Sequence, residues 1–183
     1  VNFKKYSDPI YNKLEFLSTV IEVAKRPDIL KISVLRFSLE FFYAIMVIYT
    51  PIYLHVYLNI PFSAILGIIM PIALSPFVIF PYILGSIADK KLGEKELLSM
   101  GIVISAFVTM TLSFIGSDSI FAWSLLLFMT RVGASFIEAM SDSYFFKHVN
   151  ASDSNLIGFF SNLRPLAFMA GPVLATLFLL VFS

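Results

Sequence analysis

Six charged residues lie inside long apolar stretches of this sequence, and their types and spacing could support chemistry. Arg131, Glu138 and Asp142 are separated by seven and four residues, which places them on one face of a helix. Arg36 and Glu40 are four residues apart and can pair on another helix. Arg164 is the only charge in the last apolar stretch. Charges in such surroundings can bind a charged solute or transfer protons.

The composition indicates that these stretches cross a membrane. Of the 183 residues, 58% are hydrophobic and only 14% are charged, which is too apolar for the surface of a soluble domain. A helix crosses the hydrocarbon core with about 20 apolar residues. We expect an all-α integral membrane protein with five transmembrane helices at about 32–58, 60–88, 97–115, 120–146 and 156–182.

The basic residues predict the orientation. Ten of the 13 Lys and Arg residues lie before the first expected helix, in the 89–96 loop or in the 147–155 loop, and the other three lie within helices. Because short cytoplasmic loops accumulate Lys and Arg, the amino terminus and the 89–96 loop are expected in the cytoplasm. We expect a multi-pass protein of the cell (inner) membrane with the lipid bilayer as a partner.

This topology places the buried charges in one layer. Glu40, Glu138 and Arg164 each lie eight residues from the expected inner end of their helix, or about 12 Å along it. An unpaired charge at that depth costs at least about 2.5 kcal/mol, so pairing or exposure to a cavity is expected. We expect Glu138 to pair with Arg164 or to exchange a proton, and Arg131 to contact a substrate or a counter-ion. The equally weighted alternative is a static structural pair, because Arg36 and Glu40 can satisfy each other.

Patterns of enzymes and metal sites are missing from the sequence. It has no cysteine, no G-x-S-x-G and no H-E-x-x-H, and its two histidines are assigned to opposite membrane sides. We therefore expect no enzymatic activity, no metal site and no cofactor. The near balance of 13 basic and 12 acidic residues gives no reason to expect a nucleic-acid partner.

Residues 1–31 are expected to form an amphipathic segment ahead of the transmembrane bundle, 32–183. Apolar residues repeat at helical spacing behind Asp8-Pro9, a helix cap followed by proline. These apolar positions are Ile10, Leu14, Leu17, Ile21 and Ala24. The segment is expected to lie on the inner membrane surface, and packing against a soluble part is the alternative.

The second expected helix is rich in proline and ends in a polar loop. Pro76 and Pro81, together with Gly171-Pro172 in the fifth helix, are expected to kink helices or to set their packing. The loop runs Gly85-Ser86-Ile87-Ala88-Asp89-Lys90-Lys91-Leu92-Gly93-Glu94-Lys95. We expect Gly85 to permit close helix approach, Asp89 to cap a neighbouring helix, Lys90 and Lys95 to pair with an acid, and Gly93 to allow the turn.

The loop resembles the signature G-x-L-a-D-[RK]-x-G-[RK]-[RK] of the major facilitator superfamily, although Gly93 comes one residue late and Glu94 stands where a base is usual. Arg131-Val132-Gly133-Ala134-Ser135 and Ala170-Gly171-Pro172-Val173 resemble motifs of the fourth and fifth helices of that family more loosely. The resemblance implies five helices of a six-helix half. The amphipathic segment favours the carboxyl-terminal half, and the amino-terminal half is the alternative.

The family implies a secondary active transporter that moves a small solute by alternating access, with protons as one coupling option. In such a half, the first and fourth helices line the cavity and the third faces lipid, which fits the charges on the first and fourth and their absence from the third. The implied partners are the missing other half and a small-molecule substrate. Asp89 and Lys90 are expected to stabilise one conformation through a cap and a pair with Asp142. The alternatives are a plain positive-inside loop and, for the whole chain, a non-transporting structural or assembly protein.

Overall fold

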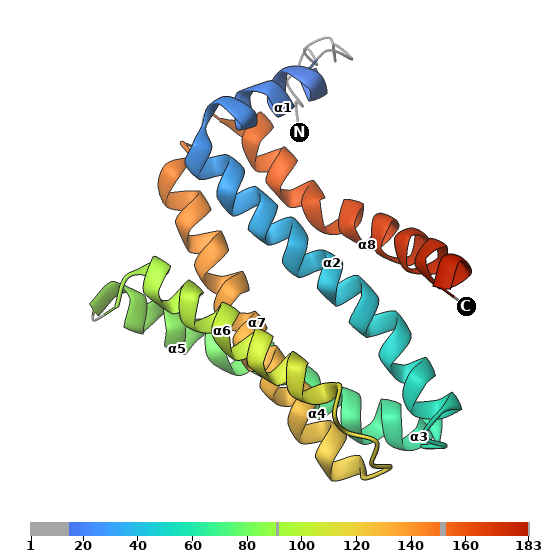
Figure 1. Ribbon diagram of the computed structural model, residues 1–183. Helices are drawn as coiled ribbons and strands as arrows, with labels where there is room; N and C mark the ends of the chain where they lie inside the picture. Colours follow the sequence, from blue (N-terminus) through green and yellow to red (C-terminus); the bar gives the residue numbers. More distant parts are fainter. Residues whose placement is uncertain (1–14, 91, 151–152, 183) are drawn as a thin grey trace, which may run out of the picture.

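A computed structural model describes residues 15–90, 92–150 and 153–182 (Figure 1). These residues contain helices and no strand, which confirms the all-α prediction. The helices are α1 (Glu15–Lys25), α2 (Pro27–Val56), α3 (Phe62–Ala64), the π-helical turn η1 (Ile65–Ile69), α4 (Met70–Leu74), α5 (Pro76–Lys90), α6 (Glu94–Leu112), α7 (Ile120–His148) and α8 (Ser154–Phe182).

Four helical segments are long and apolar enough to cross a membrane. They are Pro27–Val56, Phe62–Ala88, Glu94–Leu112 and Ile120–His148. They coincide with the first four expected spans, although α2 begins before residue 32 because Pro27 occupies the first turn, where its missing N–H costs nothing. The fifth expected span, 156–182, lies within α8, which is not among these four segments, so a fifth span stays a prediction. These helices indicate a multi-pass membrane protein.

The second span is not one regular helix, and its prolines explain why. Proline has no N–H to donate, and its ring clashes with the carbonyl of the preceding helical turn. The wider turn η1 lies directly before α4, which has proline in its first turn at Pro71. Pro76 then begins α5, and Pro81 lies inside it. Of the expected kink positions in this span, Pro76 therefore lies at the start of a helix and Pro81 lies inside one.

The helix α7 is the central element of the bundle. In Figure 1, α2 and α8 run side by side, while α5 and α6 lie against α7. In the 18-residue apolar stretch of α7, 50% of the residues are buried inside the protein, compared with 11% in that of α6. The helix α6 is therefore peripheral, in line with the expectation that the third span faces lipid.

Small residues bring two pairs of helices into close contact. A Cβ added at Gly101 of α6 would lie 2.7 Å from the Gly133 carbonyl oxygen, and one added at Gly133 of α7 would lie 2.7 Å from Ser105 N. A Cβ at Gly171 of α8 would lie 2.9 Å from Ala44 Cβ of α2. Such backbone-to-backbone approach is typical of helix packing in membranes.

The helix α1 leaves part of its apolar surface uncovered. Leu17 and Ile21 are 60% and 55% exposed, whereas Thr19 and Val23 are buried. The apolar face of α1 is therefore partly exposed, and its expected position on a membrane surface stays a prediction. Asp8-Pro9, Ile10 and Leu14 lie outside the described residues.

Gly133→Ala tests the contact between α6 and α7. We expect it to lower the free energy of unfolding by about 1–3 kcal/mol, because its Cβ would lie 2.5 Å from Ser105 Oγ and also 2.7 and 2.8 Å from backbone atoms of α6, which cannot move aside as a side chain can. The matched control is Gly158→Ala in α8, where no atom lies within 4 Å of the new Cβ. The control should be neutral or slightly stabilising, because alanine favours a helix over glycine. Thermal unfolding in detergent measures both, and equal effects would contradict the close contact.

Single cysteines test the orientation in this cysteine-free chain. Ser117 lies between α6 and α7, and Ser154 begins α8 at the other end of α7. We expect Ser117→Cys to react with a membrane-impermeant maleimide from outside intact cells and Ser154→Cys to react only after permeabilisation. The reverse pattern would overturn the orientation.

Candidate functional site: a buried charge cluster

Arg36 of α2 lies among three carboxylates from two helices. Its Nη2 is 3.1 Å from Glu40 Oε1 and 3.2 Å from Glu138 Oε1. Its Nη1 is 3.2 Å from Asp142 Oδ1 and donates to the Glu138 carbonyl oxygen at 3.4 Å. A guanidinium has five donors in a fixed fork, so a single arginine can hold several oxygens. Arg36 thereby joins α2 to α7.

Glu40 is the most deeply buried member of the cluster. It has no exposed surface, and Arg164 of α8 places Nε 3.6 Å from its Oε2. Neither carboxylate oxygen of Glu40 has a well-aligned hydrogen bond, so the two nearby guanidinium groups stabilise it mainly by charge. The Arg36 side chain is 11% exposed and that of Arg164 is 60% exposed. Arg36 is therefore the better shielded of the two cations.

The structure brings the expected layer of charges together but pairs two of its members differently. Arg36 and Glu40 pair as neighbours on one helix, as their spacing suggests. Glu138, however, pairs with Arg36 rather than with Arg164, and Arg164 pairs with Glu40. Equal depth does not determine which faces of two helices meet, and the packing of α2 on α7 places Arg36 beside Glu138.

Two cavities open beside the cluster, and Glu138 lines both. The first has a volume of about 220 Å³ and is lined by α7 and by side chains of α2, α4, α5 and α8. Its lining residues are Tyr43, Val47, Leu74, Phe77, Arg131, Glu138, Arg164 and Phe168. The second, of about 180 Å³, lies towards Asp142 and is also lined by Pro81 and Ser135. A carboxylate that faces two cavities can contact solutes or water in either.

Arg131 lies apart from the ion pairs. It is 3% exposed, and its Cζ lies 5.4 Å from the centre of the Tyr43 ring. Among the described residues no carboxylate pairs with it, and its Nη1 has no hydrogen-bond partner. Sequence reasoning missed Tyr43, because a tyrosine inside an apolar stretch gives no sign of which helix it will face.

The 85–95 loop differs in three respects from expectation. No atom lies within 4 Å of a Cβ added at Gly85, so this glycine does not mediate a close helix contact. Gly93 has φ of −68°, which any residue can adopt, so the turn does not need glycine. Lys95 lies over the Tyr144 ring, 5.7 Å from its centre, and pairs with no acid among the side chains that the structure describes.

Glu94 supplies the contact between this loop and α7. It forms an ion pair with Lys147 and accepts a hydrogen bond from Ser143 Oγ at 3.3 Å. The sequence offered one signal of this role, because Glu94 stands where the family signature has a basic residue. Asp142 pairs with Arg36, and the side chains of Asp89 and Lys90 lie outside the described residues.

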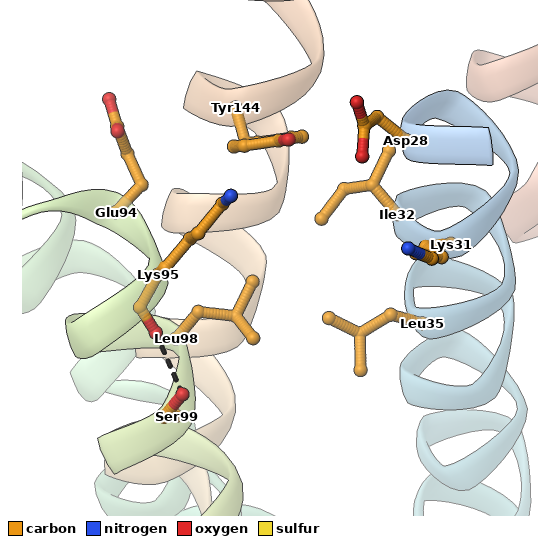
Figure 2. Close-up of a pocket in the computed structure, with 9 residues that line it drawn as sticks. All are labelled: Asp28, Lys31, Ile32, Leu35, Glu94, Lys95, Leu98, Ser99 and Tyr144. Carbon is orange, nitrogen blue, oxygen red and sulfur yellow. Dashed lines mark hydrogen bonds between the residues drawn. The ribbon is translucent and has the colours of Figure 1, made fainter. Parts of the chain in front are cut away.

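A groove separates α2 from α6 at the same end of the bundle. Figure 2 shows Asp28, Lys31 and Leu35 of α2 on one side and Glu94, Lys95 and Leu98 of α6 on the other, with Tyr144 of α7 between them. A second hollow, which also includes Leu35, continues along the same two helices past Ile102 and Ser105. The volumes of the two hollows are about 340 and 360 Å³.

The sequence matches no protein-family model, no curated protein and no solved structure. Within the described ranges, no group of three or more His, Cys, Asp or Glu side chains is placed to hold a metal ion.

Replacing Arg36 by methionine tests its role in the cluster. We expect a loss of about 3–5 kcal/mol in unfolding free energy, because Glu40, Glu138 and Asp142 would lose their shared cation. The matched control is Arg26→Met, since Arg26 also pairs with two carboxylates but has a side chain that is 41% exposed. That control should cost about 1 kcal/mol or less. Similar losses in chemical unfolding would contradict a special role for Arg36.

Proposed function

We propose that this chain is part of a secondary active transporter of the major facilitator type, which moves a small solute by alternating access. The observation that carries the proposal is Glu138, a carboxylate that pairs with Arg36 and also lines two cavities. A structural ion pair gains nothing from facing a cavity. A carboxylate that binds and releases protons needs such access.

The arrangement of the cluster supports proton coupling. Arg36 is shared by Glu40, Glu138 and Asp142. If Glu138 takes up a proton, its attraction to Arg36 weakens, and Arg36 remains paired with the other two carboxylates. The contact between α2 and α7 would then depend on protonation, and these helices are the expected cavity-lining first and fourth helices of the half. Protonation of Glu138 would favour one of two arrangements of α2 and α7, while Arg36 keeps its other ion pairs.

The groove between α2 and α6 supports the proposed six-helix half. Its middle is lined mostly by apolar side chains, including Leu39, Phe42, Ile102 and Ala106, and its floor includes Ile137 of α7. Charges appear at the end shown in Figure 2, where Asp28, Lys31, Glu94 and Lys95 lie. An apolar helix with a polar end fits this distribution, and we assign the groove to a sixth transmembrane helix. In this arrangement α8 would be the fifth transmembrane helix.

The second half of the transporter would face this cluster. Such carriers work by rocking two halves around a site at their interface. We place the protein in the cell (inner) membrane with its amino terminus in the cytoplasm, and we assign the chain to the carboxyl-terminal half on the basis of α1 and its exposed Leu17 and Ile21. The alternative function, a structural or assembly protein, requires only a static cluster.

Glu138→Gln in the natural polypeptide that carries this sequence tests the coupling role. We expect loss of solute-dependent proton uptake into proteoliposomes loaded with a pH-sensitive dye, with solute exchange retained, because glutamine keeps the shape but cannot carry the proton. The control Glu22→Gln alters an exposed carboxylate in a pair with Arg26 and should leave uptake unchanged.

The same assay separates transport from a static role. A structural cluster predicts that Glu138→Gln lowers stability, while no solute in a broad panel drives flux in the unaltered protein. The 183-residue chain by itself is expected to show no vectorial uptake, because rocking needs two halves. Uptake by this chain alone would contradict the two-half arrangement.

A further inference from the structure

We infer that the 220 Å³ cavity at Arg131 is a binding site for a small organic monoanion, whose carboxylate pairs with the Arg131 guanidinium and whose apolar body lies against the aromatic wall. This ligand assignment rests on the proposed transport function, since it names the class of solute carried. Neither the spacing of charges nor the resemblance indicates which solute the protein takes.

Two residues that line this cavity each carry a buried donor without a hydrogen-bond partner. Arg131 is 3% exposed and Tyr43 is 7% exposed, and both line the cavity. In the part of the chain that the structure describes, neither Arg131 Nη1 nor Tyr43 Oη has a hydrogen-bond partner. Buried donors are nearly always paired in native proteins. Because both residues line the same cavity, we assign the missing partner to an acceptor that binds there and that the two donors reach by rotation of their side chains.

The surrounding charges indicate the sign of that acceptor. Arg36 already forms ion pairs with the three carboxylates of the cluster, and Arg164 pairs with Glu40. Of the four arginines, Arg131 is the one that pairs with no carboxylate among the described residues. A planar carboxylate matches the guanidinium fork and can accept from both of its nitrogens. The charged side chains that line the cavity are Arg131, Arg164 and Glu138, so one added negative charge gives the lining two negative charges for its two positive ones.

Glu138 restricts the ligand to one negative charge. It lines the same cavity as Arg131, seven residues further along α7. A second carboxylate on the ligand would approach Glu138 in surroundings that screen charge poorly. The cavity therefore disfavours a ligand with two negative charges and accommodates a monoanion whose other end is neutral.

The walls of the cavity fit an apolar ligand body. Phe77, Phe168, Leu74 and Val47 complete the lining. Phe77 also forms a T-shaped pair with the Tyr43 ring, with ring centres 5.4 Å apart at an angle of 90°, which restricts the direction of the tyrosine. The volume suits a ligand smaller than a typical drug molecule. Benzoate combines one carboxylate with a small aromatic body and is therefore a suitable probe.

Binding of benzoate to the natural polypeptide in lipid nanodiscs tests the assignment by calorimetry. We expect benzoate to bind and benzamide, its uncharged analogue, to bind at least tenfold more weakly. Arg131→Gln should weaken benzoate binding by ten- to a hundredfold, in line with the loss of a charge-assisted hydrogen bond. Arg131→Lys should retain part of the affinity, because it keeps the charge but loses the fork. Tyr43→Phe should weaken binding severalfold.

Controls separate this site from folding and from non-specific attraction. Arg26→Gln removes a basic residue far from the cavity and should leave binding unchanged. Arg131→Gln should not lower the thermal stability of the ligand-free protein, because it removes a buried charge that has no counter-ion. A clear loss of stability, with benzoate and benzamide bound equally, would mean that Arg131 is a structural residue stacked on Tyr43.

The remaining outcomes separate this assignment from the proposed function. If benzoate does not bind while other solutes still drive proton uptake, the monoanion assignment is wrong and transport stands. If benzoate binds as expected but no flux follows, the site stands and transport is wrong. Equal binding of benzoate by Arg131→Gln and the unaltered protein would overturn the assignment, with water left as the partner of these donors.

Discussion

The pairing of Arg36 with Glu40, Glu138 and Asp142 is the interaction on which the rest of this bundle depends. Bringing these charges into an apolar bundle costs several kcal/mol per ion, and only close pairing offsets that cost. The pairing fixes the rotation of α2 and α7 relative to each other, since both must present polar faces to the same point. The apolar residues Leu39, Ala134 and Ile137 then pack beside the charges.

The same constraint creates the cavities. Three carboxylates and two arginines occupy the contact between α2, α7 and α8 and lie between two apolar clusters at opposite ends of α2 and α7. Prolines interrupt the neighbouring second span, so that α4 and α5 contribute Leu74, Phe77 and Pro81 to the walls. Irregular backbone in a membrane protein is stable where it borders a cavity or other protein. The proline pattern and the charge cluster are therefore parts of one arrangement.

The periphery of the bundle is built differently. Between α6 and α7, glycine allows backbone atoms to touch at Gly101 and Gly133. Lipid provides no hydrophobic driving force between helices, so close packing replaces it. At the ends, partly exposed ion pairs such as Arg26 with Asp153 connect the start of α2 to the start of α8. These pairs contribute little energy but define which helix ends meet.

The sequence by itself determined the helices, because about 20 apolar residues in a membrane leave the backbone no other way to satisfy its hydrogen bonds. It also determined that Arg36 and Glu40 could pair, since helical spacing is a local property. Only the tertiary structure decided that Glu138 pairs with Arg36, that Tyr43 stacks on Arg131, and that Gly85 contacts no neighbouring helix while Gly133 does. These depend on the rotation of each helix about its own axis, which is set by packing between elements distant in the chain and leaves no pattern in any one segment.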